Sequence, residues 1–109
     1  MPETDLESLQ SILTEIGNLE KMMAGKSKSD LEEDMILERA VSMTLGLMGE
    51  KANKISSAFK EAHPEIEWRK MIALRNRIVH NYEDLDFDLI YDTVSRKIPE
   101  LKAQLEKLF

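Results

Sequence analysis

The stretch ILERAVSMTLGLMGEKANKISSAF, residues 36–59, decides the fold class of this chain. Its apolar side chains recur at helical spacing and cover a wide arc of the helix circumference. They are Ile36, Ala40, Val41, Met43, Leu45, Leu47, Met48, Ala52, Ile55 and Phe59. A helix with so wide an apolar arc is buried by several neighbouring helices, or by a partner chain as well.

Two glycines interrupt this predicted helix. Gly46 and Gly49 would each cost about 1 kcal/mol relative to alanine in a helix interior. We therefore expect them either to admit a close neighbouring backbone or to mark a bend. A capping box, Ser29-Asp30-Leu31-Glu32, predicts the start of the helix, which we expect to run from there to about Phe59.

The remaining segments also show helical periodicity. A capping box at residues 4–7 opens a helix over residues 4–23, which Gly25 ends. His63-Pro64 begins a third helix that runs to about Asn81, and Asp86 caps a fourth. The last apolar stripe continues to Leu108, with a kink or short break expected at Pro99. We predict a single all-α domain, residues 1–109, folded as an up-down bundle of four to five helices.

Composition limits the function classes. The chain has 109 residues and no cysteine, which excludes disulfides, thiolate metal sites and a cysteine nucleophile. Its acidic N-terminus does not resemble a signal peptide, and no stretch has the length of a membrane span, so we expect a cytoplasmic protein. A net charge of -6 argues against broad nucleic-acid binding. A local basic patch remains compatible with it, because Arg69, Lys70, Arg75 and Arg77 cluster in the sequence.

The same cluster runs into the most reactive stretch, RNRIVHNY, residues 75–82. Arg75 offers a guanidinium that grips a phosphate with two hydrogen bonds. His80 offers an imidazole that transfers protons near pH 7. Together they suit cleavage of RNA, in which a ribose 2′-hydroxyl attacks the neighbouring phosphorus. No metal or other cofactor is required, and with two histidines in the chain we expect no metal cluster.

The geometry of this pair leaves two possibilities open. On an ideal helix Arg75 and His80 lie about 140° apart, so one helix does not aim both at one phosphate. Either the helix ends near His80, or a twofold dimer assembles the site from two copies. A simpler interpretation also exists, in which Arg75 and His80 only satisfy a carboxylate and a carbonyl, and Tyr82 is a half-buried packing residue.

The sequence resembles the HepT-like toxins of the HEPN superfamily. The resemblance covers about residues 31–105 and rests on Met48-Gly49-Glu50, on residues 63–69 (HPEIEWR) and on residues 75–82 (RNRIVHNY). The last block has the Arg, polar residue, three more residues, His pattern of that family, followed two positions later by Tyr. This chain departs from the family in having Lys51 where alanine is frequent and Asn81 where glycine is common.

The resemblance implies a dimeric, HEPN-like helical bundle and a metal-independent endoribonuclease toxin. It implies that Arg75 and His80 are catalytic, that Asn76 assists, and that Tyr82 accepts AMP. The implied partners are an RNA substrate, a second copy of the chain and a minimal nucleotidyltransferase antitoxin. The alternative is a noncatalytic module that binds a nucleotidyltransferase or a nucleotide.

Overall fold

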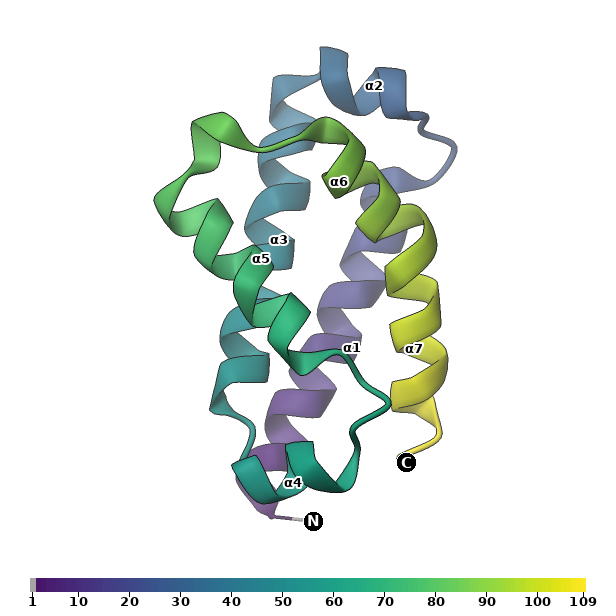
Figure 1. Ribbon diagram of the computed structural model, residues 1–109. Helices are drawn as coiled ribbons and strands as arrows, with labels where there is room; N and C mark the ends of the chain where they lie inside the picture. The colour runs from purple at the N-terminus through teal and green to yellow at the C-terminus, as the bar shows by residue number, and fades with distance from the viewer. Residues whose placement is uncertain (1) are drawn as a thin grey trace.

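Four helical rods form the bundle in the computed structural model, which describes residues 2–109 (Figure 1). They are α1 (Glu3–Met23), α3 (Met35–Lys54), α5 (Trp68–His80) and the rod made of α6 (Phe87–Asp92), the π-helical turn η2 (Thr93–Lys97) and α7 (Ile98–Glu106). Two short helices, α2 (Lys28–Glu33) and α4 (Ser57–Ala62), lie at opposite ends, and the 3₁₀ turn η1 (Tyr82–Asp84) follows α5. The described residues contain no strand, so the all-α prediction is confirmed.

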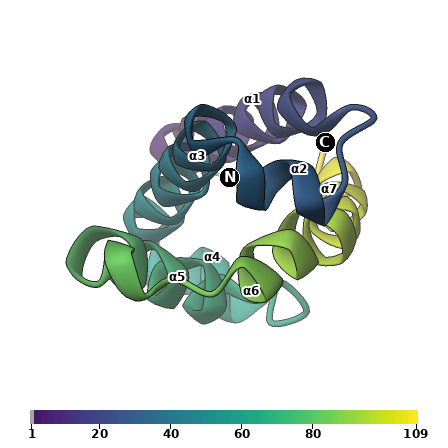
Figure 2. The ribbon, with the colours of Figure 1, turned by 90° about the horizontal axis from the view of Figure 1, so that it is seen from above.

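The core lies between α1, α3 and the α6–α7 rod. Figure 2, seen along the rods, shows the four rods arranged around a common centre. The middle of the apolar stripe of α1, Leu9 to Leu19, is buried, as are the residues of α3 that face it. The core side chains that are least exposed are Leu9, Ile12, Ile16, Leu31, Val41, Met48, Ala52, Ile90 and Leu105. Helix α3 is the central element, because it packs extensively against both α1 and α5.

The predicted helix over residues 30–59 is wrong as a single element. It is three helices, α2, α3 and α4, because two capping residues interrupt the apolar stripe. The carboxylate of Asp34 accepts the Leu37 N–H at 3.1 Å and opens α3. The hydroxyl of Ser56 accepts the Phe59 N–H at 3.2 Å and opens α4. Each cap satisfies a backbone donor that the start of a helix leaves free.

The first predicted capping box is also wrong, and its aspartate has a different role. Pro2, not Thr4, precedes α1, and no side chain caps that end. Asp5 is 1% exposed and holds the start of α4 instead. It accepts the Ser56 N–H at 2.8 Å and the Ser56 hydroxyl at 2.7 Å. These hydrogen bonds compensate the burial of the carboxylate and tie the N-terminus of α1 to the end of α3.

Three further boundaries differ from the prediction. The second capping box starts at Ser27, not Ser29, and its partner is Asp30. His63 ends α4, and α5 begins only at Trp68, whose indole N–H donates to the His63 carbonyl at 3.1 Å. The break expected at Pro99 lies earlier, as η2 (Thr93–Lys97), and Pro99 itself is in the first turn of α7. There the Ile98 N–H reaches back five residues to the Thr93 carbonyl.

Other local predictions are confirmed. Gly25 has a φ of 71° and ends α1 with a left-handed residue. The carboxylate of Asp86 accepts the Asp88 N–H at 2.8 Å and caps α6. Asn81 follows the last residue of α5, but with a φ of -137° it does not adopt the left-handed conformation.

Candidate functional site

Helix α5 carries three of the four candidate residues, and the fourth begins the next turn. Arg75, Asn76 and His80 lie on α5, and Tyr82 is the first residue of η1. The guanidinium Nη1 of Arg75 donates to the Asn76 Oδ1 at 3.0 Å. Within residues 2–109 no carboxylate lies within 4.0 Å of this guanidinium. The remaining N–H donors of Arg75 are therefore available to an anion from outside the chain.

The position of Arg75 is set by a glycine on α3. A Cβ built on Gly49 would lie 2.4 Å from the Arg75 Cβ and 2.6 Å from the Met71 carbonyl oxygen. Glycine is thus the residue that lets the two backbones approach at this point. Gly46, one turn earlier on α3, has more room, with the nearest atom 3.7 Å away on Ile78. The expectation of a close neighbouring backbone is confirmed for Gly49, with α5 as the neighbour, and is not met at Gly46.

His80 is the last residue of α5 and its side chain is exposed. Because α5 is helical through both residues, the side chains of Arg75 and His80 leave it about 140° apart. One copy of the chain therefore does not direct both groups at a common point. In the described part of the chain, the imidazole of His80 makes no side-chain hydrogen bond or ion pair.

Tyr82 has polar partners that the local sequence did not reveal. Its hydroxyl donates to the carboxylate of Glu38 on α3, and the hydroxyl of Ser42 donates to the same carboxylate at 2.9 Å. The Arg39 guanidinium lies 5.3 Å from the centre of the Tyr82 ring. Burial, together with the hydrogen bond and negative charge of Glu38, raises the pKa of Tyr82 to about 12.

Glu38 is thus a residue near the site that sequence reasoning missed. It is 44 positions away from Tyr82, and no short motif links the two. The only local sign was its spacing of four residues from Ser42, which is common on any helix. The contact anchors the chain just after His80 to the start of α3.

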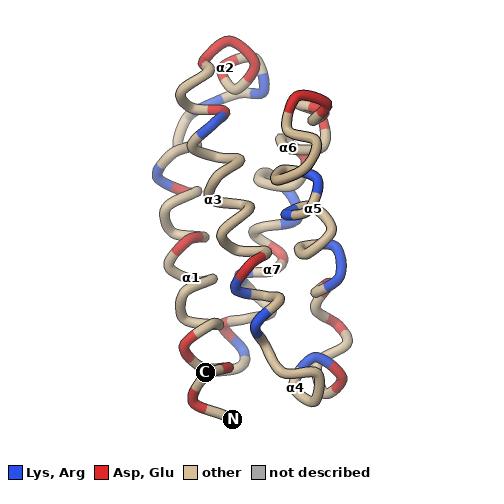
Figure 3. The backbone as a smooth tube through the Cα atoms, turned by 90° about the vertical axis from the view of Figure 1, so that its left-hand side faces the viewer, with Lys and Arg blue, Asp and Glu red and all other residues tan. Residues whose placement is uncertain are grey.

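Charge is distributed unevenly around α5. The basic residues that cluster in the sequence, Arg69, Lys70, Arg75 and Arg77, all lie on this helix, which has no acidic residue. Figure 3 shows this basic helix below the acidic turn that precedes α6, while the acidic α2 lies on the other side of the molecule in that view. A basic helix of this kind attracts a polyanion locally although the net charge of the chain is -6.

Residues 2–109 contain neither a cluster of metal ligands nor a membrane-spanning helix. There is no group of three or more His, Cys, Asp or Glu side chains arranged to hold a metal ion. No helix there is both long and apolar enough to cross a membrane.

The comparisons with known proteins agree with a ribonuclease fold of this kind. A family model described as "Ribonuclease HepT-like" matches residues 12–108. "Probable ribonuclease HepT" of Thermococcus cleftensis is 32% identical over 108 residues, which cover 99% of this chain and 98% of that protein. "Putative RNase TTE0752" of Caldanaerobacter subterraneus subsp. tengcongensis is 29% identical over 100 residues, covering 92% and 89%. No solved structure matches significantly.

These matches define an all-helical protein of a ribonuclease class. The chain belongs to the HepT-like ribonuclease family, since the family model spans most of its length. The predicted resemblance is confirmed.

Proposed function

We propose that this protein is a metal-independent endoribonuclease that cleaves RNA by transesterification. His80 removes the proton from a ribose 2′-hydroxyl, whose oxygen then attacks the adjacent phosphorus. Arg75 stabilises the negative charge that develops on the phosphate oxygens. A second imidazole, or the protonated form of the first, gives a proton to the leaving 5′-oxygen. The products are one fragment ending in a 2′,3′-cyclic phosphate and one beginning with a 5′-hydroxyl.

The observation that carries the proposal is the state of Arg75. Its guanidinium has no carboxylate partner, yet its backbone is fixed by the close approach to Gly49. What distinguishes Arg75 from the other unpaired arginines of α5 is that its backbone is held in close contact with α3, so its free N–H donors are offered from a fixed position. Asn76 holds one N–H of the guanidinium and so assists by orienting it.

We further propose that a twofold dimer completes the site. Four large apolar side chains are exposed on the α3–α5 pair: Ile36 (78% exposed), Met43 (64%) and Leu47 (39%) on α3, and Val79 (55%) on α5. By helical periodicity the three residues of α3 form one stripe opposite its buried residues, and with Val79 they make the apolar face that points away from the core. Helical periodicity places Arg75 beside this apolar face. A twofold contact through it presents the same patch twice and brings two copies of α5 together. Arg75 of one copy and His80 of the other then reach one phosphate.

Mixed dimers test this arrangement. Arg75→Ala and His80→Ala protomers, each inactive alone, are expected to regain cleavage when unfolded and refolded together, because the mixed dimer keeps one intact Arg75–His80 pair. Two copies of the same variant refolded alone serve as the control. A mixture that stays inactive, or a protein that sediments as a monomer at high micromolar concentration, contradicts the shared site.

We propose a toxin–antitoxin role with a minimal nucleotidyltransferase as the partner and Tyr82 as the acceptor of AMP. The Tyr82 oxygen attacks the α-phosphorus of ATP, pyrophosphate leaves, and the phenolic proton is lost. The modification removes the donor that binds Glu38 and places a phosphodiester beside that carboxylate, which repels it. After incubation with the nucleotidyltransferase and ATP, the intact mass of the wild-type protein is expected to rise by one AMP, and that of Tyr82→Phe is not. Tyr82→Phe is expected to keep much of its cleavage activity. Equal addition to both proteins contradicts the assignment.

The assay for the activity itself is cleavage of RNA by the purified protein in EDTA. Wild type is expected to cleave, and His80→Ala is expected to be inactive at the same folded concentration. If neither cleaves, the protein is instead a noncatalytic module that docks a nucleotidyltransferase. We expect RNA cleavage and the transfer of AMP to Tyr82 to take place in the cytoplasm, where RNA and ATP are present.

A further inference from the structure

A groove lies between α5 and the α6–α7 rod, on the opposite side of α5 from the apolar face. It encloses about 380 Å³. Leu45 and Met48 of α3 form its floor, while Leu74 of α5 and Leu89 and Leu101 of the other rod form its walls. The volume is within the range of sites for small organic ligands, and apolar walls with few polar groups are typical of such sites.

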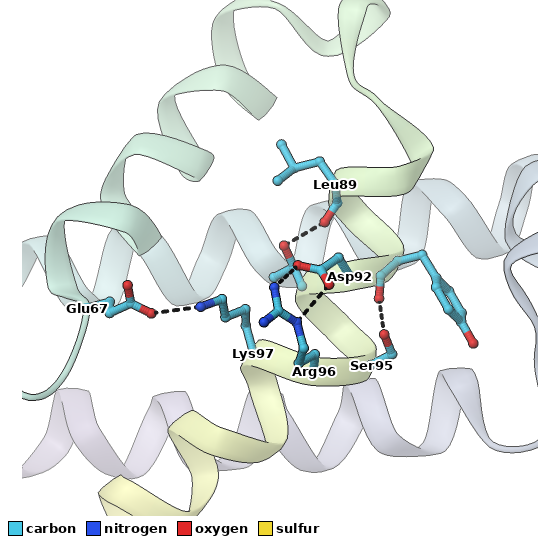
Figure 4. A network of polar contacts seen from close by, with 8 residues as sticks. Glu67, Leu89, Asp92, Ser95, Arg96 and Lys97 are labelled. Atoms are coloured by element: carbon cyan, nitrogen blue, oxygen red, sulfur yellow. Dashed lines mark hydrogen bonds and ion pairs between the residues drawn. The ribbon is translucent and has the colours of Figure 1, made fainter.

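The charges at the rim of the groove cancel. Lys97 pairs with Glu67 at 3.4 Å across one end of the groove (Figure 4). Asp92 accepts two hydrogen bonds from Arg96, at 2.9 and 3.0 Å. The lining contains three basic residues (Lys70, Arg77 and Lys97) and three acidic residues (Glu67, Asp92 and Glu100). A neutral group with apolar faces therefore fits the interior better than a phosphate does.

The far wall of the groove includes the π-helical turn η2. π-Helical turns are rare and frequently mark functional sites. Here the widened turn is held by hydroxyl groups, since Thr93 donates to the Leu89 carbonyl at 2.7 Å and Ser95 donates to the Tyr91 carbonyl at 2.6 Å (Figure 4). Thr93 faces the groove and keeps its lone pairs as acceptors. Gln104, which donates to the Glu65 carbonyl at 3.0 Å, offers its Oε1 as a second acceptor.

The groove adjoins the candidate site through α5. By helical geometry Ala73 lies about 20° and Arg77 about 60° from the direction of His80. Both line the groove. Arg77, like Arg75, has no carboxylate within 4.0 Å in residues 2–109. An RNA strand that crosses α5 at His80 thus passes Arg77 before it reaches the groove mouth.

We infer that this groove binds the base of a nucleotide next to the scissile phosphate, with Arg77 on its phosphate. This inference rests on the proposed function and names the part of the site that selects RNA sequence. A nucleobase is flat and neutral, with apolar faces and polar edges, so it fits apolar walls with a few acceptors at the rim. Its donor groups would bond Thr93 and Gln104.

A second copy of the chain is a poorer occupant. A stable subunit interface takes about 20–30 residues from each partner, which is more than line this groove. The larger exposed apolar residues Ile36, Met43 and Val79 lie elsewhere, on the opposite side of the α3–α5 pair. The groove therefore remains open to substrate in the proposed dimer.

Nucleotide titration tests the groove without depending on cleavage. The protein, labelled with ¹⁵N, is titrated with AMP, GMP, CMP and UMP, and with ribose 5-phosphate as a probe that lacks a base. We expect saturable shifts of the amides of Ala73, Leu74, Leu89 and Thr93 with at least one nucleotide and not with ribose 5-phosphate. No such shifts with any nucleotide, or equal shifts with the sugar phosphate, overturn the inference.

A matched pair of variants fixes the location. Ala73→Phe fills the groove mouth from an exposed helix position, and Ala103→Phe places the same side chain on an exposed position of α7 outside the groove. We expect Ala73→Phe to weaken nucleotide binding at least tenfold and to flatten the base preference of cleavage, while Ala103→Phe changes neither. Equal nucleotide binding and equal base preference in the two variants overturn the inference. A dimer that dissociates in Ala73→Phe and not in Ala103→Phe also overturns it, because the groove then belongs to the subunit interface.

The two proposals fail separately. Nucleotide binding by a wild type that does not cleave RNA supports the groove and contradicts the ribonuclease assignment. Cleavage with an unchanged base preference in Ala73→Phe supports the ribonuclease assignment and contradicts the groove.

Discussion

The two faces of α3 contrast sharply. Toward the core, α3 presents Val41, Met48 and Ala52, which are at most 1% exposed. Toward α5 it presents Gly46 and Gly49, and α5 itself contributes a single buried residue, Trp68. The first face contributes apolar burial, the main driving force of folding. The second holds a helix on which Arg75 is half-buried and Asn76, Arg77 and His80 are exposed. The stabilising region and the reactive region therefore share one helix but use separate residues.

The largest expected effect is on cleavage alone. Arg75→Ala is expected to lower cleavage about 10²–10⁴-fold, the range for losing a group that stabilises charge or moves a proton. Arg75→Lys is expected to lose most of the activity too, because an ammonium does not reproduce the planar two-bond grip. Thermal unfolding of both variants is expected to match the wild type. If either variant unfolds at a lower temperature in proportion to its loss of activity, Arg75 also stabilises the fold, which contradicts the separation of stabilising and reactive residues.

A substitution in the α1–α3 core is expected to have the opposite effect, lowering stability without lowering the cleavage rate of the folded protein. Ile12 is fully buried, and Ile12→Ala is expected to lower the free energy of unfolding by about 2–5 kcal/mol. At low temperature the fraction that remains folded is expected to cleave at the wild-type rate. Urea denaturation followed by circular dichroism gives the first quantity, and cleavage per folded molecule gives the second. A reduced rate per folded molecule shows that the core also shapes the site.

Gly49 is the point where the two regions meet. Gly49→Ala forces α5 outward, since the new Cβ lies 2.4 Å from the Arg75 Cβ. Overpacking of this kind costs about 1–3 kcal/mol, and the shift of Arg75 is expected to lower cleavage at least tenfold.

Two other glycines serve as controls for this change. Gly46→Ala meets its nearest atom at 3.7 Å, and Gly17→Ala has no neighbour within 4 Å. Both are expected to keep wild-type cleavage and to be slightly more stable, because alanine favours the helix. If Gly49→Ala behaves like these two, the close approach does not position Arg75.

The smallest expected effect concerns Tyr82 and alkaline pH. Its pKa is about 12 in the folded protein and about 10 in the unfolded chain, so the contribution to stability is complete below pH 10 and is lost as pH rises toward 12. Because the ring is partly exposed, we expect a loss of about 1 kcal/mol. Subtracting the stability of Tyr82→Phe across the same pH range isolates this group. An identical pH dependence of the two proteins contradicts the contact with Glu38.

Periodicity was sufficient to predict the fold class but not the breaks. The apolar stripe continues past Asp34 and Ser56, so the capping role of these residues was hidden within a pattern that predicted one helix. The Asp5–Ser56 contact that stabilises the second break joins residues 51 positions apart. Such a contact depends on how α1 and α3 pack, which local spacing does not contain.

The candidate site also has one part that the sequence predicts and another that depends on how the helices pack. Gly49 is predicted from sequence as a site of close approach, because glycine inside a helix is otherwise costly, whereas the same prediction fails for Gly46. The Glu38–Tyr82 hydrogen bond and the groove along α5 depend on the three-dimensional arrangement of helices, and neither follows from a motif. The roles of Arg75, Asn76, His80 and Tyr82 stay predictions.

The central claim is that α5 carries a metal-independent transesterification site, and the chemistry of the product ends tests it most directly. Wild-type protein in EDTA is expected to release RNA fragments with 2′,3′-cyclic phosphate and 5′-hydroxyl ends, and His80→Ala is expected to release none. Fragments with 5′-phosphate ends, cleavage that EDTA abolishes, or equal cleavage by His80→Ala would contradict the account.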